Sequence, residues 1–128
     1  IVEIYNNGNP RVYYGTDPNG TGTLSRDSLV FDKVDVRTGE WMQLTFVKEA
    51  NAVVCYVNGV EAQRIPTANP YHSDILLQPF GFGGDNRASN QYPFKGTIKD
   101  FALYKTPLTA EQVAYVAENY VEILKEYV

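Results

Sequence analysis

The sequence has 128 residues, of which 44% are hydrophobic and 13% aromatic, so the chain holds enough apolar side chains for the core of one domain over residues 1–128. Eleven Lys and Arg against 15 Asp and Glu give a net charge of −4, which argues against nucleic acid and anionic membrane surfaces as partners, because both require clustered positive charge. No apolar stretch approaches the roughly 20 residues that a transmembrane helix needs, so membrane insertion is not expected.

Short extended segments separated by turn residues fill the chain as far as residue 108, and this pattern predicts an all-β domain. Side chains that alternate between apolar and polar identify half-buried strands, and clusters of Gly, Pro, Asn and Asp mark the turns between them. We expect strands at residues 2–5, 11–15, 28–32, 41–48, 52–57, 60–65, 75–82 and 97–104.

The pair of strands around Asn58-Gly59 is the clearest local prediction. This dipeptide suits the two positive-φ positions of a type I′ turn, so it should join the strands at 52–57 and 60–65 in a hairpin. Cys55, the only cysteine, lies in the first of them, which excludes an internal disulfide and a cysteine-based zinc site. We expect it to be a small buried hydrophobe rather than a nucleophile.

Aromatic residues of the strands are candidates for the core. Trp41 opens an apolar strand and is expected to be buried with its N–H paired. Tyr13 and Tyr14 point to opposite faces of their strand, so one should be in the core and the other exposed, and the sequence does not decide between them. Phe101 and Leu103 share one face of the last strand.

After residue 108 the period changes to that of a helix, predicted over residues 109–127. Thr109 and Gln112 have the spacing of a capping box, and Leu108 and Val113 have the spacing of a hydrophobic staple. One stripe of the helix should pack on the sandwich or on a neighbouring domain, and it consists of Val113, Val116, Ala117, Tyr120, Leu124 and Tyr127.

Five short motifs follow one another over about residues 39–120. They are Gly39-Glu40-Trp41, Tyr56-Val57-Asn58-Gly59, Phe82-Gly83-Gly84, the segment from Phe94 to Ile98, and the segment from Leu108 to Val113. Together they resemble the laminin-G-like (LamG) members of the concanavalin A-like lectin/glucanase superfamily. The resemblance implies a jelly-roll β-sandwich with a C-terminal α-helix.

The chain departs from the family pattern in two places. The family usually has an acidic residue directly after the Ile of the last strand, whereas here Lys99 follows Ile98 and Asp100 comes one position later. Residues 1–38 also supply fewer strands than the family has there. That shortage indicates either an N-terminally truncated copy or a sequence that begins inside the domain.

Enzymes with this fold hydrolyse β-glucans with a pair of carboxylates in an E-x-D-x-x-E motif, and that motif is missing from the sequence. Asp32 and Asp35 are expected to be solvated turn charges, and the acidic residues after 110 belong to the polar face of the helix. A Gly-x-Ser-x-Gly nucleophile elbow is also missing. We therefore predict that the domain is not an enzyme.

The loop of residues 84–92 and the loop before it offer the best candidate ligand site, because they combine aromatic rings with amide, acidic and guanidinium groups. Sugars bind by stacking on aromatic rings while planar polar groups pair with their hydroxyls. The alternative is that the Asp and Asn side chains only brace the turn. The candidate ligand-binding residues are Tyr71, His72, Asp85, Asn86, Arg87, Asn90 and Tyr92.

No cofactor is predicted, but calcium is known in the resembling family and stays open here. Asp85 with Asn86, or Asp17 with Asn19, could supply the oxygen ligands that calcium prefers, although neither pair belongs to an EF-hand loop.

The resemblance implies a non-catalytic carbohydrate-binding, lectin-like module of a larger secreted or cell-surface protein. Its partners would be a glycan or polysaccharide and the other domains of the same polypeptide. A protein-interaction or spacer module is the alternative, because a fold does not determine a function, and a glycoside hydrolase domain is a further one. A sugar-binding module predicts a shallow groove rimmed by exposed aromatics, and a protein-interaction module predicts a sizeable exposed apolar patch.

Overall fold

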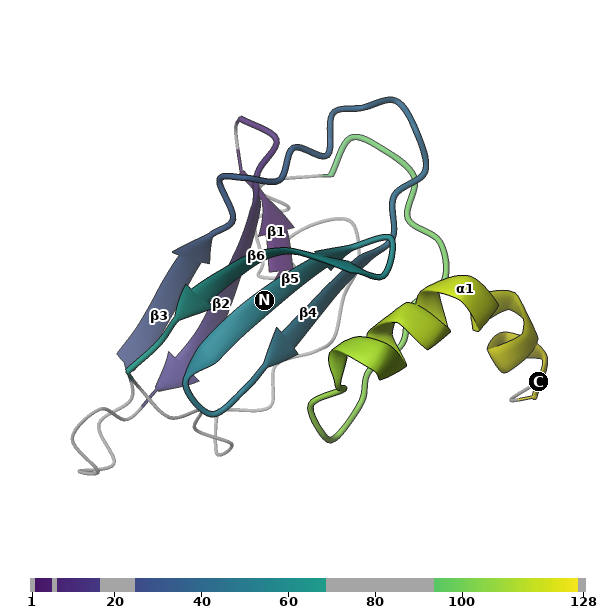
Figure 1. Cartoon of the computed structure of the whole chain (residues 1–128). Helices are drawn as coiled ribbons and strands as arrows, with labels where there is room; N and C mark the ends of the chain where they lie inside the picture. The colour runs from purple at the N-terminus through teal and green to yellow at the C-terminus, as the bar shows by residue number, and fades with distance from the viewer. Residues whose placement is uncertain (1, 6, 17–24, 69–93, 127–128) are drawn as a thin grey trace, which may run out of the picture.

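The computed structural model describes residues 2–5, 7–16, 25–68 and 94–126, which form two antiparallel three-stranded sheets and one helix (Figure 1). The strands are paired in chain order within each sheet, as expected for short connections. The first sheet contains β1 (Val2–Ile4), β2 (Pro10–Thr16) and β3 (Ser25–Val30), the second contains β4 (Leu44–Lys48), β5 (Ala52–Val57) and β6 (Val60–Pro66), and the helix is α1 (Ala110–Glu126).

The main core lies between the two sheets. Alternation along β2 turns Val12 and Tyr14 inward, where they meet Val53 and Cys55 of β5. Tyr14 is therefore the core tyrosine of its strand, which settles the choice that the sequence left open. The prediction for Cys55 is confirmed, because its side chain is fully buried and burial raises the pKa of its thiol to about 12.

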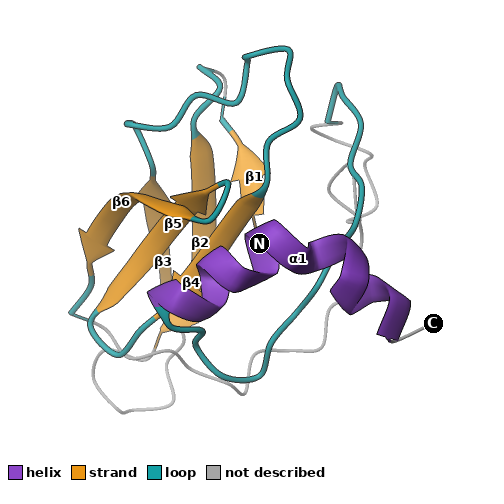
Figure 2. Cartoon of the chain, turned by 45° about the vertical axis from the view of Figure 1, so that its right-hand side comes forward, coloured by secondary structure: helices purple, strands orange, loops and turns teal. Residues whose placement is uncertain are grey.

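A second core lies between the second sheet and α1, which covers the sheet's outer face (Figure 2). Val54 and Tyr56 of β5 point to this side and pack with Val47 and with Val113 of the helix. The strand β5 is thus buried on both faces, which explains why its sequence is a continuous apolar run rather than an alternating one. The described chain has three layers, sheet on sheet on helix.

The start of α1 is confirmed in detail. The Gln112 N–H donates to the Thr109 hydroxyl oxygen at 3.2 Å, and the Thr109 N–H donates to the Gln112 side-chain oxygen at 2.9 Å. These reciprocal bonds are the capping box. Leu108 packs against the cluster that contains Val113, so the hydrophobic staple is also present.

The hairpin turn between β5 and β6 is confirmed as well, with φ of 49° at Asn58 and 83° at Gly59. The turn lies directly against the helix. A Cβ atom on Gly59 would come within 2.8 Å of the Ala117 Cβ and 3.2 Å of the Ala114 Cα, so only glycine permits this approach.

Gln63 of β6 links the two sheets at the end of β3. Its side-chain amide donates to a carboxylate oxygen of Asp32 at 2.8 Å, and its carbonyl oxygen accepts the Lys33 N–H at 3.0 Å. Asp32 is exposed as predicted, but it also holds this link.

The predicted last strand, residues 97–104, is wrong. The segment between residue 94 and α1 forms no strand, and Phe101 and Leu103 are 51% and 79% exposed instead of sharing a buried face. Asp100 has a φ of 53°, which interrupts the alternation of an extended chain. The predicted strand at 75–82 lies outside the described residues, and the jelly-roll connection of the sandwich stays a prediction.

Candidate functional site

The loop from residue 31 to residue 43, between β3 and β4, is anchored at its first end by a buried asparagine. Asn9 is only 7% exposed, and its side-chain amide donates to the Val34 carbonyl at 2.6 Å and to the Asp32 carbonyl at 3.4 Å. Val34 is itself buried in the main core. The start of the loop is therefore fixed by both hydrogen bonds and packing.

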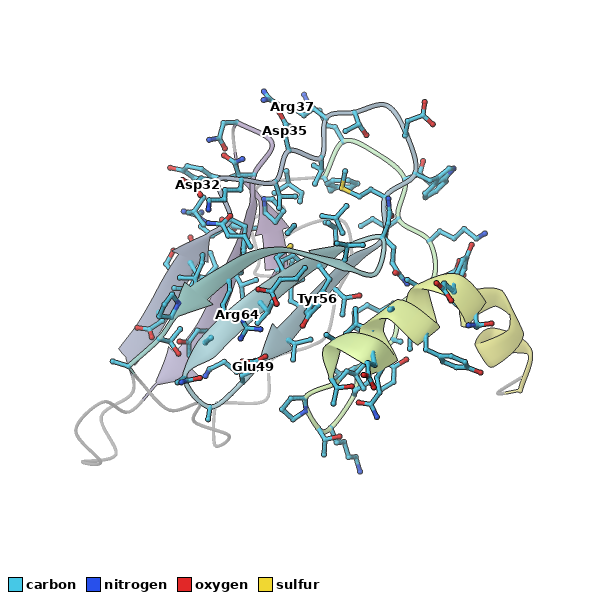
Figure 3. The ribbon with its side chains drawn as sticks, viewed as in Figure 1. Asp32, Asp35, Arg37, Glu49, Tyr56 and Arg64 are labelled. Carbon is cyan, nitrogen blue, oxygen red and sulfur yellow. The ribbon has the colours of Figure 1, made fainter. Side chains whose placement is uncertain are left out.

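An ion pair fixes the next stretch of the loop (Figure 3). The Arg37 guanidinium contacts the Asp35 carboxylate at 2.6 and 2.9 Å, and the Arg37 N–H also donates to it at 2.9 Å. The side-chain and backbone hydrogen bonds from Arg37 lower the pKa of Asp35 to about 2. Gly8 lies so close that a Cβ there would be 2.4 Å from both partners, and its carbonyl accepts the Val36 N–H at 3.0 Å.

A second asparagine anchors the other end of the loop. The Asn58 side-chain oxygen accepts the Gln43 N–H at 2.9 Å, and the Asn58 N–H donates to the Gln43 carbonyl at 2.9 Å. Between the anchors the chain turns sharply at Gly39, where φ is 78°, and the Glu40 N–H donates to the Thr38 hydroxyl at 3.2 Å. The residues after this turn are held outward on a fixed scaffold.

A hollow of about 290 Å³ lies at this turn, lined by Gly39, Glu40, Trp41 and Thr97. Thr97 comes from the segment that leads to α1, which passes beside the loop in Figure 1. The hollow is shallow and open, and its volume lies just below the range for ligand sites, so it suits a surface contact with one ring-sized group.

The prediction that Trp41 belongs to the core is wrong, because its side chain is 68% exposed. The strand that it was expected to open begins only at Leu44. Residues 41–43 belong instead to the loop, whose path is set by the Thr38-Gly39 turn and by the bonds between Gln43 and Asn58. Trp41 therefore does not follow the inward and outward alternation of β4.

The lining of the hollow contains the kinds of group that sugar sites use. The Trp41 ring offers an apolar face on which a pyranose can stack, and the Glu40 carboxylate and Thr97 hydroxyl offer partners for sugar hydroxyls. The sequence interpretation assigned Trp41 to the core rather than to a ligand site and did not consider Glu40. The signal for them is the Thr38-Gly39 turn directly before them, which separates them from the strand.

The site residues predicted from the sequence all lie outside the described residues, so their loop stays a prediction. They are Tyr71, His72, Asp85, Asn86, Arg87, Asn90 and Tyr92. The candidate calcium ligands Asp17 and Asn19 also lie outside.

An ionic cluster on the outer face of the second sheet is a second place to consider (Figure 3). Arg64 of β6 contacts the Glu61 carboxylate at 2.9 Å and also pairs with Glu49 of the turn before β5. Both carboxylates favour the charged guanidinium and raise the pKa of Arg64. Burial, together with the charge of Glu61, raises the pKa of Tyr56. Because its charges are paired with one another, the cluster serves to tie strands together.

Four further polar contacts involve the aromatic rings of Tyr14, Tyr5 and Tyr13. The Tyr14 hydroxyl donates to Asp27 at 2.9 Å, and the Lys48 ammonium lies 5.4 Å from the Tyr14 ring centroid. Burial raises the pKa of Tyr14 and lowers that of Lys48. On the opposite face of the sheet, the Arg11 guanidinium lies 4.2 Å from the Tyr5 ring centroid and 4.6 Å from that of Tyr13.

Within the described ranges, no three His, Cys, Asp or Glu side chains come together as possible ligands of a metal ion. The described helix is also not long and apolar enough to cross a bilayer.

Comparison with known proteins decides the family. Residues 2–114 match a family model of laminin-G type described as the concanavalin A-like lectin/glucanases superfamily. The chain belongs to this superfamily. The match includes the six described strands and the first turn of α1, and it confirms the LamG-like resemblance inferred from the sequence motifs.

A similar solved structure is the crystal structure of an S-layer domain-containing protein from Clostridium thermocellum, at 14% sequence identity and a TM-score of 0.47. The alignment covers 84% of this chain and 51% of the other, so the chain spans about half the length of that structure.

Proposed function

We propose that this LamG-like domain is a non-catalytic carbohydrate-binding module and that the hollow beside Trp41 is part of its binding site. The observation that carries the proposal is the 68% exposed Trp41 ring, held on a loop that is anchored at both ends. An exposed aromatic ring that is held in place offers a stacking surface, and a flat sugar face is a suitable partner for it. Membership of a lectin and glucanase superfamily supports this choice.

The absence of the E-x-D-x-x-E motif from the sequence supports a binding role over a catalytic one. Glu49 and Glu61, which share a basic partner, both contact Arg64 on a sheet face rather than lining the hollow. We expect the purified domain to release no reducing ends from β-glucans. Turnover that disappears when one of the domain's own acidic residues is mutated would contradict this expectation.

We place the module in a secreted or cell-surface protein, with the other domains of the same polypeptide as further partners. The family membership supports this setting, and the low cysteine content is compatible with it. The loop of Asp85 to Tyr92 remains a candidate second part of the sugar site, and calcium remains a candidate ligand there.

A glycan array probed with the 128-residue domain tests the proposal, followed by calorimetric titration of the best glycan. Trp41→Ala should weaken binding about fivefold or more, because sugar stacking on one aromatic ring contributes on the order of 1 kcal/mol or more. Tyr115→Ala is the matched control, since Tyr115 is also an exposed aromatic, 61% accessible, but lies on α1. An array without any binder, or equal affinity in both variants, would contradict the assignment of the hollow.

A protein-interaction module is the second candidate, and one observation favours it. The segment before α1 exposes five large apolar side chains, and exposed apolar residues gathered in one segment favour a protein contact. The exposed residues are Phe94, Ile98, Phe101, Leu103 and Tyr104. If the array stays blank while the dye ANS binds the native domain and Leu103→Ser weakens that binding, this candidate takes precedence.

A further inference from the structure

The lining of the hollow carries one negative charge. Glu40 is the charged side chain among the residues that line it. In the loop, the nearest basic group, Arg37, is paired with Asp35. In the segment of Thr97, the Lys99 ammonium lies 3.5 Å from the Asp100 carboxylate, and Lys95 is exposed two residues before Thr97. A ligand that enters the hollow therefore meets the Glu40 carboxylate, whose charge is not cancelled by Arg37 or Lys99.

Trp41 adds to the attraction for a positive charge. The indole ring has a negative face, and tryptophan is the aromatic residue that attracts cations most strongly. An exposed tryptophan next to a carboxylate thus attracts a cation by two independent effects, a ring quadrupole and a full charge. Anionic groups are repelled by both, and by the net charge of −4.

The size of the hollow fits this chemistry. A volume of about 290 Å³ suits one ring-sized group, so a sugar ring and its substituent would occupy the hollow together. A ring stacked on Trp41 can bring a substituent near Glu40, because both residues line the same hollow.

We propose that the hollow selects sugars carrying a protonated amine, the hexosamine units of a deacetylated glycan, over their N-acetylated and anionic counterparts. This inference rests on the proposed function, because it names the ligand class of the same site. A cation over an exposed ring contributes about 0.5–1 kcal/mol and a surface ion pair about 0.2–1 kcal/mol, which together correspond to a preference of about three- to thirtyfold.

Titration of the 128-residue domain with glucosamine tetramers and with N-acetylglucosamine tetramers tests the proposal. At about pH 6, where an amine with a pKa near that of an α-amino group is protonated, the glucosamine tetramer should bind about three- to thirtyfold more tightly. Raising the salt concentration should reduce this preference, since a surface ion pair is screened. Glu40→Gln should weaken only the glucosamine tetramer, while Trp41→Ala should weaken both.

Glu118→Gln is the control for net charge, because it removes the same charge from the exposed face of α1. An equal loss of preference in Glu118→Gln and Glu40→Gln would overturn the inference, because the effect would then come from the overall charge. Equal binding of both tetramers to the unmodified domain would overturn it too, while leaving the proposed function intact. Failure to bind either tetramer or any other glycan would instead contradict the proposed function itself.

Discussion

Replacing the buried Asn9 by aspartate tests how the loop that carries the hollow is fixed. The Asn9 amide is a donor to two carbonyl oxygens, at 2.6 Å to Val34 and 3.4 Å to Asp32, in a site that is 7% exposed. Asn9→Asp keeps the shape of the side chain but removes the donor. The lost hydrogen bonds should cost about 1–3 kcal/mol.

At neutral pH the introduced carboxylate also faces those carbonyl oxygens without a counter-charge. Burial and repulsion should raise its pKa in the folded state, and each unit of pKa costs about 1.4 kcal/mol at pH values above both the folded and the unfolded values. A rise of about two units gives a total loss of about 4–6 kcal/mol at pH 7. The folded variant holds the proton of this carboxyl more tightly than the unfolded chain does. Its stability therefore falls as pH rises through the raised pKa and recovers below about pH 4.

Urea unfolding of the wild type and of Asn9→Asp at pH 7 and at about pH 4 measures this loss. The matched control is Asn7→Asp, because Asn7 is exposed and its side-chain oxygen only accepts the Asn9 N–H at 3.3 Å, a role that a carboxylate keeps. We expect the control to unfold near the wild-type midpoint. Wild-type stability in Asn9→Asp, or a loss of stability that does not change with pH, would show that the Asn9 amide is not a buried donor to these two carbonyl oxygens.

Three other predictions concern the core and the helix. Burial raises the pKa of the Cys55 thiol from 9.0 to about 12, so its contribution to the free energy of unfolding is fully present below pH 9 and is lost as pH rises toward 12. The loss is at most about 4 kcal/mol, and Cys55→Ala should therefore lose less stability than the wild type at alkaline pH. Gly59→Ala should destabilise the domain by more than about 1 kcal/mol, because φ is 83° and the added Cβ would lie 2.8 Å from the Ala117 Cβ; unchanged thermal melting would contradict the contact with α1. Thr109→Ala should lower the free energy of unfolding by about 0.5–2 kcal/mol, because it removes the cap of α1. An unchanged urea midpoint with an unchanged slope would show that the cap does not stabilise the domain.

The elements that the sequence predicts best are those set by local chemistry. The capping box of Thr109 and Gln112 and the positive φ angles of Asn58-Gly59 depend on residues within a few positions, so their spacing alone identifies them. The strand Ala52–Val57 was predicted with its observed bounds, because its apolar run reflects burial on both faces.

The elements that the sequence does not predict depend on distant parts of the chain. An extended apolar segment such as residues 97–104 becomes a strand only when another strand offers its hydrogen bonds, and periodicity does not report whether one does. Trp41 was misplaced for a related reason, since its exposure follows from the bond between Gln43 and Asn58, 15 residues apart. The hollow was missed with it, because Thr97 comes from yet another segment.

The loop that carries the hollow separates the residues that hold the fold from those that meet the ligand. Asn9 and Asn58 carry the hydrogen bonds at its two ends, whereas Trp41 and Glu40 lie between the anchors with exposed side chains. Removing an exposed side chain uncovers little core, so substitutions at Trp41 and Glu40 should leave the unfolding midpoint near that of the wild type. A loss of sugar affinity in those variants can then be assigned to lost contacts. An anchor variant should instead lose stability and affinity together, because it releases the scaffold on which the ring is held.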